Sequence, residues 1–176
     1  FTSCNFNGRT ELLSVEYLKI TNKVTTLNSL FQNCTSLTKV NTDGWNTGAV
    51  TQMSWMCWNC YKLTEIDVSN WNTSNVTDMY IAFCNCSSLT KLNVNNWKLS
   101  KLKSLDHTFQ GCTNLTEIDV SNWGTNSLTY AFSTFYQCNN LTTIKGICNW
   151  NMSNVTNIGR MFNDCKSVTE LDLRNW

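Results

Sequence analysis

The stretch Trp71–Asn96, WNTSNVTDMYIAFCNCSSLTKLNVNN, is repeated with small changes before and after it in this chain of 176 residues. A Trp opens each repeat, and a Cys follows later in the same repeat. The Trp series is Trp45, Trp71, Trp97, Trp123, Trp150 and Trp176, and the Cys series is Cys34, Cys60, Cys86, Cys112, Cys138 and Cys165. Both series keep a 26-residue period, which is lengthened once, between Ile144 and Trp150. Self-similarity at this period predicts an array of stacked units.

One half of each repeat carries the signature of a strand. Leu63, Ile66 and Val68 occupy the first, fourth and sixth positions of their segment. This L-x-x-L-x-L spacing is that of leucine-rich repeats, and it predicts a short parallel strand whose alternate residues turn inward.

The other half has a different apolar spacing. Val76, Met79, Phe83 and Cys86 recur at steps of three, four and three. That pattern indicates one face of a short helix or a succession of tight helical turns.

Together the two halves predict an α/β fold: a leucine-rich-repeat-like right-handed solenoid with seven short parallel strands on one face and short helices on the other. One domain covers residues 1–176, with an irregular first unit at 1–34 and regular 26-residue units at 35–176. In the first unit, Phe1 and Cys4 repeat a Phe-x-x-Cys ending, and five extra residues precede Leu12. The Trp series should form a ladder at the end of the strands. Since the chain does not begin with Met and stops at Trp176 without a second half-unit, we expect a piece of a longer or assembling protein.

The whole unit resembles that of the BspA-like leucine-rich-repeat surface proteins of bacteria, which reads much like WNTSNVTDMxxxFxxCxSLTxLDVSN. The match covers Val24–Trp176 and is strongest in Trp71–Leu92 and Leu115–Trp123. This resemblance implies an extracellular or cell-surface protein used in adhesion. It implies no catalytic residues.

Composition excludes some classes of partner. The net charge of +1 gives no electrostatic reason to expect nucleic acid or an anionic membrane. No run of 18 apolar residues exists, so we expect no membrane insertion in this segment. The sequence contains no motif that predicts a cofactor.

An enzyme is not predicted. The single His, His107, lies beside Asp106 and would need Cys84 as an activated thiolate. The position of His107 holds Ser, Trp, Ile, Ser and Arg in other units, which indicates a solvent-facing and unconstrained place.

The cysteines predict a buried ladder of reduced thiols, because seven of the ten share one repeat position. Disulfides between neighbouring units are an alternative. Cys57-x-x-Cys60 followed by Cys84-x-Cys86 also resembles a four-thiolate zinc site, but three of these four residues occupy inward positions, so we predict no metal site.

Charges alternate along the predicted strands. The third strand position reads Lys39, Glu65, Lys91, Glu117, Thr143 and Glu170. Stacking sets these side chains side by side, so the strand face should be a self-paired surface.

Aromatic residues gather instead on the other face. Positions that helical spacing turns outward hold Trp55, Trp58, Tyr80, Ile81, Phe132 and Tyr136. Exposed apolar patches mark contact surfaces, so these six residues are the candidate binding site for protein or carbohydrate. The alternative is that they lie flat as cover for a thin core.

Eight N-x-S/T sequons mark possible glycosylation sites: Asn33, Asn72, Asn75, Asn85, Asn114, Asn140, Asn151 and Asn154. A chain this rich in Asn, Ser and Thr also makes sequons by chance.

These observations lead to two hypotheses of function. The first is an extracellular repeat protein that mediates adhesion by binding protein or carbohydrate on another cell or matrix. The second is a structural subunit of an extracellular filament or surface layer, in which copies of the chain stack head to tail.

Overall fold

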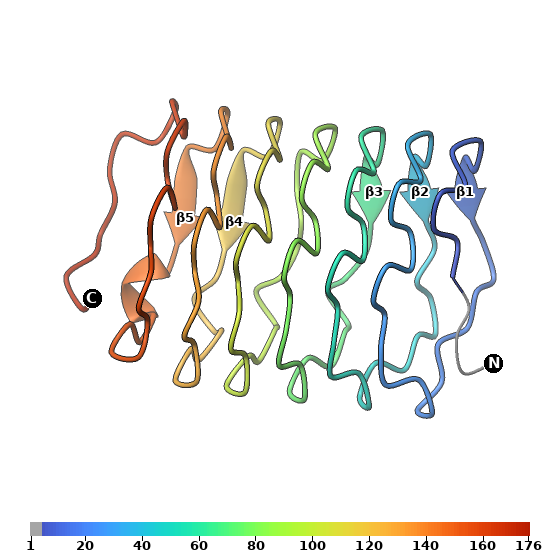
Figure 1. Cartoon of the computed structure of the whole chain (residues 1–176), viewed down its shortest axis with the longest axis horizontal. Coiled ribbons are helices and arrows are strands. Elements are labelled where there is room, and N and C mark those ends of the chain that lie inside the picture. The colour runs from blue at the N-terminus through green and yellow to red at the C-terminus, as the bar shows by residue number, and fades with distance from the viewer. Residues whose placement is uncertain (1–4) are drawn as a thin grey trace.

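The computed structural model describes residues 5–176 and arranges the repeats as coils stacked side by side, in chain order from one end to the other (Figure 1). Strands β1 (Ser14–Val15), β2 (Lys39–Val40) and β3 (Glu65–Ile66) form a parallel three-stranded sheet. Strands β4 (Glu117–Asp119) and β5 (Thr143–Lys145) form a second parallel sheet, and the 3-10 helix η1 (Ile147–Asn149) follows. Within this range no helix has the length and apolar character needed to cross a bilayer.

The strand register confirms the prediction of parallel strands with inward alternate residues. Val15 pairs with Val40, and Val40 with Ile66. Ile118 pairs with Ile144 in the second sheet. Each of these apolar residues is buried while the residue before it is exposed. The apolar positions of the repeat therefore face the core.

Five of the seven expected strands are present in the described chain. The segment 89–94 has only a single bridge, between Lys91 and Glu117, and the segment 168–173 contains no strand. No pairing joins β3 to the segment 89–94 among the described residues. The ladder of the strand face is therefore interrupted between the third unit and the fourth.

The prediction of short helices on the opposite face is wrong, because residues 5–176 contain no α-helix and only the three-residue η1. The second halves of the units form what we call the turn face. There, alternate N–H groups donate to carbonyl oxygens of the following unit at N···O distances of 2.7 to 3.3 Å, as at Met79, Ile81, Phe83 and Asn85. The N–H groups between them donate three residues back within their own unit, as at Ala82, Cys84 and Cys86. The apolar spacing thus belongs to a succession of β-turns, not to helices.

These turns require left-handed backbone at two positions in each unit. The first of them has φ between 54° and 60° at Ser29, Trp55, Ile81, His107, Ser133 and Arg160. Left-handed backbone is uncommon for residues other than Gly, and most of all for β-branched ones such as Ile. The expectation that the His107 position is unconstrained is therefore wrong, because its backbone conformation is fixed by the turn.

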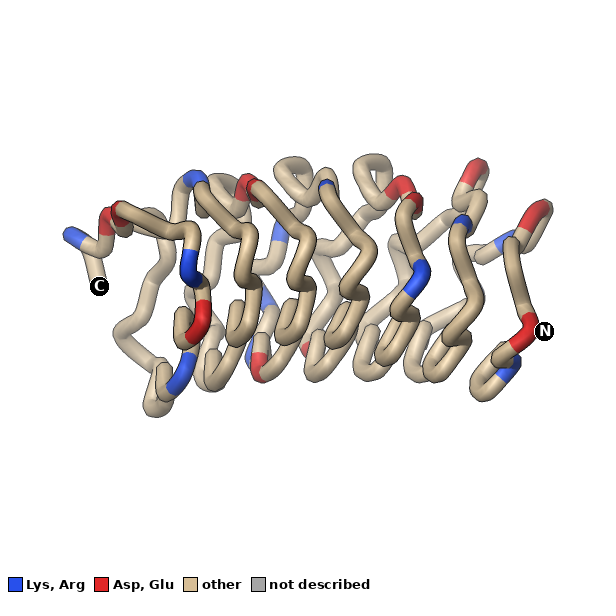
Figure 2. The backbone as a smooth tube through the Cα atoms, turned by 90° about the horizontal axis from the view of Figure 1, so that it is seen from above, with Lys and Arg blue, Asp and Glu red and all other residues tan. Residues whose placement is uncertain are grey.

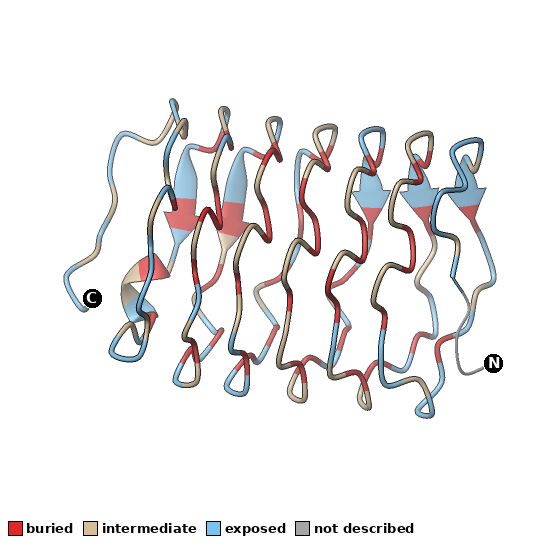
Figure 3. Cartoon of the chain, viewed as in Figure 1, coloured by how far each residue is buried: buried red, intermediate tan, exposed pale blue. Residues whose placement is uncertain are grey.

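Aromatic stacks run through the core. The predicted Trp ladder is confirmed: the rings of Trp45, Trp71, Trp97, Trp123, Trp150 and Trp176 stack in sequence with centroids 5.4 to 6.4 Å apart. A second stack joins Phe83, Phe109, Phe135 and Phe162 at 5.6 to 6.0 Å. Buried residues consequently recur at equivalent places in successive coils (Figure 3).

The first unit has a different register from the one expected. Phe1 and Cys4, which were assigned to the Phe-x-x-Cys ending, lie outside the described residues. The ring of Phe6 stacks on the Phe of the next unit at 5.6 Å, so Phe6 occupies the repeat position of Phe and Arg9 that of Cys. The N–H of Leu12 then donates to the carbonyl of Arg9, as Leu residues do to ladder Cys in later units. The prediction of five extra residues before Leu12 is therefore wrong.

Candidate functional site

Four side chains of the turn face meet edge to face across four units, and we call them the aromatic row. The ring centroids of Trp55 and Tyr80 lie 5.4 Å apart, with an interplanar angle of 89°. Tyr80 meets His107 at 6.1 Å and 84°, and His107 meets Phe132 at 5.3 Å and 71°. All four side chains are half-buried. Edge-to-face contacts of this kind are worth about 0.5–1.5 kcal/mol each beyond area burial.

The row alternates between two adjacent repeat positions. Trp55 and His107 occupy the left-handed position, and Tyr80 and Phe132 occupy the position before it. The hydrogen bonds between successive units of the turn face, which we call the turn ladder, hold equivalent residues next to each other. A ring at one of the two positions therefore contacts a ring at the other position one unit later. The alternation thereby spaces the rings for edge-to-face packing.

The other predicted site residues do not join this row. Trp58, Ile81 and Tyr136 are half-buried, and no ring contact is made by Trp58 or Tyr136 within residues 5–176. Conversely, the place of His107 in the row was missed, because His107 was weighed only as a catalytic residue. A row of aromatic rings at alternating columns, read across successive repeats, is the signal that would have found it.

Polar groups beneath the row hold its backbone. Asp78 accepts hydrogen bonds from the N–H of Tyr80 and the hydroxyl of Ser54, both at 2.9 Å. Asp106 accepts one from the N–H of Phe132 at 2.7 Å. Burial raises the pKa of Asp106 above its usual value. These carboxylates act as supports for the turns that carry the rings.

The catalytic grouping considered from the sequence does not gain an activated thiol. Cys84 is buried, and that burial raises its pKa to about 12, so the thiol stays protonated at neutral pH. The imidazole Nδ1 of His107 forms a hydrogen bond with the side-chain oxygen of Gln110. No group of three or more His, Cys, Asp or Glu side chains that could hold a metal ion occurs in the described part of the chain.

The ladder cysteines are free thiols that share one contact. Each Sγ donates to the main-chain oxygen at the Phe position of the preceding unit, at 3.0 to 3.2 Å, for Cys34, Cys60, Cys86, Cys112, Cys138 and Cys165. Burial raises the pKa of Cys34 and of Cys165 to about 11. The structure therefore agrees with the ladder of reduced thiols and not with disulfides between units.

The eight sequons differ in their surroundings. Five Asn residues are exposed: Asn72, Asn114, Asn140, Asn151 and Asn154. Asn33, Asn75 and Asn85 are half-buried. The amide nitrogen of Asn85, to which a glycan would attach, donates to the side chain of Asn59 at 2.8 Å inside a ladder of Asn side chains. A glycan is therefore accommodated better at the exposed sequons than at Asn85.

The strand face is partly self-paired, as expected. Three ion pairs join neighbouring units: Lys39–Glu65 at 3.0 Å, Lys91–Glu117 at 3.9 Å and Lys145–Asp119 at 3.4 Å. No ion pair links Glu65 to Lys91 in the described chain, where the strand ladder is also interrupted. Both signs are interspersed along the array (Figure 2). Exposed pairs of this kind contribute at most about 1 kcal/mol each.

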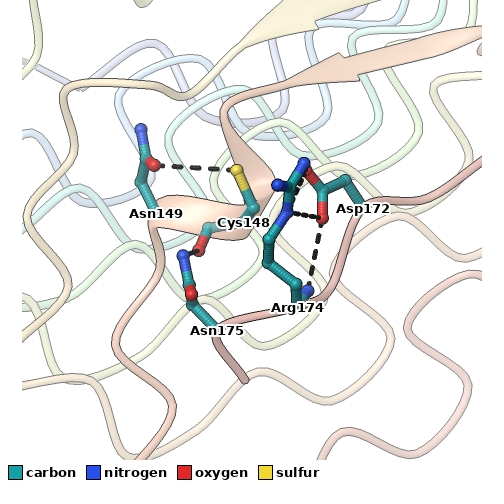
Figure 4. Close-up of polar contacts among 5 residues, drawn as sticks. All are labelled: Cys148, Asn149, Asp172, Arg174 and Asn175. Atoms are coloured by element: carbon teal, nitrogen blue, oxygen red, sulfur yellow. Dashed lines mark hydrogen bonds and ion pairs between the residues drawn. The ribbon is translucent and has the colours of Figure 1, made fainter.

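Polar contacts on the surface hold the last turn and join it to the preceding unit (Figure 4). The guanidinium of Arg174 donates to both oxygens of Asp172, at 2.6 to 3.1 Å, and this hydrogen bonding lowers the pKa of Asp172 to about 2. The side chain of Asn175 donates to the carbonyl of Cys148 at 3.1 Å. The ion pair therefore holds the turn itself, and the Asn175 contact fixes it against the preceding unit.

Stacked 26-residue units, parallel strands with an L-x-x-L-x-L core and ladders of Trp and Cys define a leucine-rich-repeat-like protein. The chain belongs to the family described as "Mycoplasma protein of unknown function, DUF285", whose profile matches residues 6–117 and again 58–176.

Two solved structures of leucine-rich repeat proteins are also similar. One, from Eubacterium ventriosum, is 24% identical with a TM-score of 0.49, and the match covers 72% of this chain but 32% of that one. The other, from Bacteroides ovatus, is 16% identical with a TM-score of 0.26, covering 92% of this chain and 67% of that one. Both scores are too low to establish a common fold, and this chain spans only about a third of the length of the first protein. A comparison with curated proteins finds none that matches the sequence.

Proposed function

We propose that this chain is part of a bacterial cell-surface or extracellular protein, a right-handed repeat solenoid of the BspA-like kind, that mediates adhesion without catalysis. The aromatic row is the contact surface, and its partner is a protein or a carbohydrate on another cell or matrix. The observation that carries the proposal is the half-exposed row of Trp55, Tyr80, His107 and Phe132 across four consecutive units.

The chemistry of the row supports a contact surface. Aromatic rings are enriched in interfaces because they bury a large area at a low cost in side-chain entropy. These rings already pack against one another, so little further freedom is lost when a partner covers them. With a net charge of +1, long-range attraction to a charged surface contributes little, and the contact depends on the rings.

The alternative is a subunit of an extracellular filament or surface layer. It is supported by the turn ladder, in which the same pattern of hydrogen bonds is repeated from one unit to the next. A contact of this kind between copies is heterologous and does not close on itself, so it grows a fibre.

The experiment compares adhesion of the native protein with that of variants taken from its own repeat. Trp55→Ser places the residue that Ser133 has at the same position, and Tyr80→Ser places that of Ser54. Tyr61→Ser is the matched control, because Tyr61 is exposed and does not belong to the row. The first two variants should lose binding to immobilised matrix proteins, glycans or cells, while the control retains it.

Two results would contradict adhesion through the row. The first is a Trp55→Ser/Tyr80→Ser double variant that binds as the native protein does. The second is ordered fibres of the native protein in electron micrographs with no binding to any of the surfaces, which favours the filament.

A further inference from the structure

A cavity of about 370 Å³ opens on the strand face, away from the aromatic row. Its walls come from three successive units, at residues 91–95, 117–119, 143 and 145. Leu92 and Ile118, both buried, contribute its apolar part. The volume lies within the range of sites for small molecules, about 300–1,000 Å³.

The cavity coincides with a departure from the repeat. In the third unit Asp67 accepts a hydrogen bond from the N–H of Ser69 at 2.9 Å, and in the fifth Asp119 accepts one from Ser121 at 3.0 Å. The fourth unit has Asn93 and Asn95 in these two places, written N-V-N instead of D-V-S. The same turn bond is made by Asn41 in the second unit and Asp172 in the seventh, but among the described residues Asn93 makes no side-chain hydrogen bond, so the turn of the fourth unit is not closed in this way.

Polar groups of the fourth unit are left without partners at this place. The side-chain oxygen of Asn95 is buried and accepts no hydrogen bond within residues 5–176. A buried polar atom without a partner costs about 1–3 kcal/mol of stability. A ligand that donates a hydrogen bond to the side-chain oxygen of Asn95, once the amide has turned toward it, would remove this cost. The interrupted strand ladder between β3 and the segment 89–94 borders the same unit.

The charges of the wall are already neutralised. Lys91 pairs with Glu117 and Lys145 pairs with Asp119, so the four charged groups leave no net charge on the wall to attract a charged ligand. They retain unused hydrogen-bonding capacity, since an ammonium has three donors and a carboxylate accepts several bonds. A ligand with many donors and acceptors but no charge fits this wall best.

We propose that this cavity binds a neutral saccharide, whose hydroxyl groups meet the polar wall and Asn95 while a face of the sugar ring covers the apolar part. This site is separate from the aromatic row and does not depend on the adhesion proposed for it.

The test is a titration followed by backbone amide NMR, using four neutral probes: methyl mannoside, methyl galactoside, cellobiose and N,N′-diacetylchitobiose. At least one probe should give saturable shifts confined to residues 91–95, 117–119 and 143–145. The variant Asn93→Asp/Asn95→Ser restores the sequence of the third and fifth units, so it should fold normally and bind about tenfold more weakly, because it loses hydrogen bonds to the ligand. Asn41→Asp in the second unit is the control and should leave the affinity unchanged.

Several results would overturn the proposal: no saturable shift with any of the four sugars, shifts that map to the aromatic row instead, or full affinity in the double variant. A triglycine peptide that shifts the cavity residues when no sugar does would show a zwitterion site and would also overturn it. Loss of adhesion in Trp55→Ser/Tyr80→Ser with sugar binding retained supports two separate sites.

Discussion

The Trp ladder provides a stringent test of the structure, because its six indoles are not equivalent. The Nε1 of Trp97 donates to the carbonyl of Val68 at 3.0 Å, and that of Trp123 to the carbonyl of Val94 at 3.1 Å. Trp71 and Trp150 are equally buried, yet their Nε1 atoms have no partner in the described chain. Replacing each Trp by Phe removes the same atoms and keeps a ring in the stack. The loss of packing therefore cancels best between Trp97, Trp123 and Trp150, which each also contact a Phe ring, whereas Trp71 makes no such contact in the described chain.

The variants then differ in whether the lost indole N–H had a hydrogen-bond partner. Trp97→Phe removes a bond worth about 1 kcal/mol, while the carbonyl of Val68 keeps the hydrogen bond from the backbone N–H of Trp71. Trp71→Phe instead removes a buried donor that had no partner, which recovers about 1–3 kcal/mol. We therefore expect Trp97→Phe to lower the free energy of unfolding by about 2–4 kcal/mol more than Trp71→Phe does.

The assay is urea unfolding followed by circular dichroism, since fluorescence changes when a Trp is removed. Trp123→Phe should behave as Trp97→Phe, and Trp150→Phe as Trp71→Phe. Repeat arrays can depart from two-state unfolding, so the four m-values must agree before the free energies are compared. Equal losses in all four variants, or larger ones at Trp71 and Trp150, would refute the assignment of the hydrogen bonds.

Three further predictions concern other parts of the array. Gly111→Ala should lower the free energy of unfolding by about 1–3 kcal/mol more than Gly124→Ala does. Both glycines have positive φ, but only at Gly111 would the new methyl group lie 2.3 Å from the side-chain oxygen of Asn85. Equal losses in thermal unfolding would contradict this. In the native protein at pH 8, a thiol reagent should modify the half-exposed Cys148 before Cys34 and Cys165, whose pKa values are raised by burial to about 11, and mass spectrometry of the labelled peptides would show the order. Asp106→Asn should stabilise more at pH 7 than at pH 4, since a carboxyl whose folded pKa is raised loses stability as pH rises through that value; a gain independent of pH would refute this.

The ladders could be predicted from the sequence because they depend on spacing alone. A Trp or a Cys that returns once in every repeat must meet its copy in the next unit once the units stack, whatever the path of the chain between them. The inward positions of the strands followed from the same periodicity, as at Val40 and Ile66.

The turn face could not be predicted in the same way, because its hydrogen bonds are not local. The spacing of Val76, Met79 and Phe83 suits a helix, yet alternate N–H groups bond to carbonyl oxygens of the following unit. Nor does residue preference indicate left-handed backbone at Trp55 or Ile81, where the hydrogen bonds of the neighbouring units impose it. Three of the six predicted site residues, Trp55, Tyr80 and Phe132, lie in one row, and the place of His107 in that row depends on contacts between units that sequence spacing does not show.

The two faces of the array also differ in how they would carry a mechanical load. The bridges of the turn face continue without a gap from Thr26 through Gln52, Asp78, Ser104 and Tyr130 to Asn157, whereas the strand ladder stops between β3 and Lys91. Bending that opens the strand face breaks no strand-to-strand hydrogen bond at that gap, where the side chain of Trp97 still donates to Val68, while bending in the opposite sense stretches an unbroken series. The array should therefore bend more easily in the direction that opens the strand face between the third and fourth units than in the direction that opens the turn face.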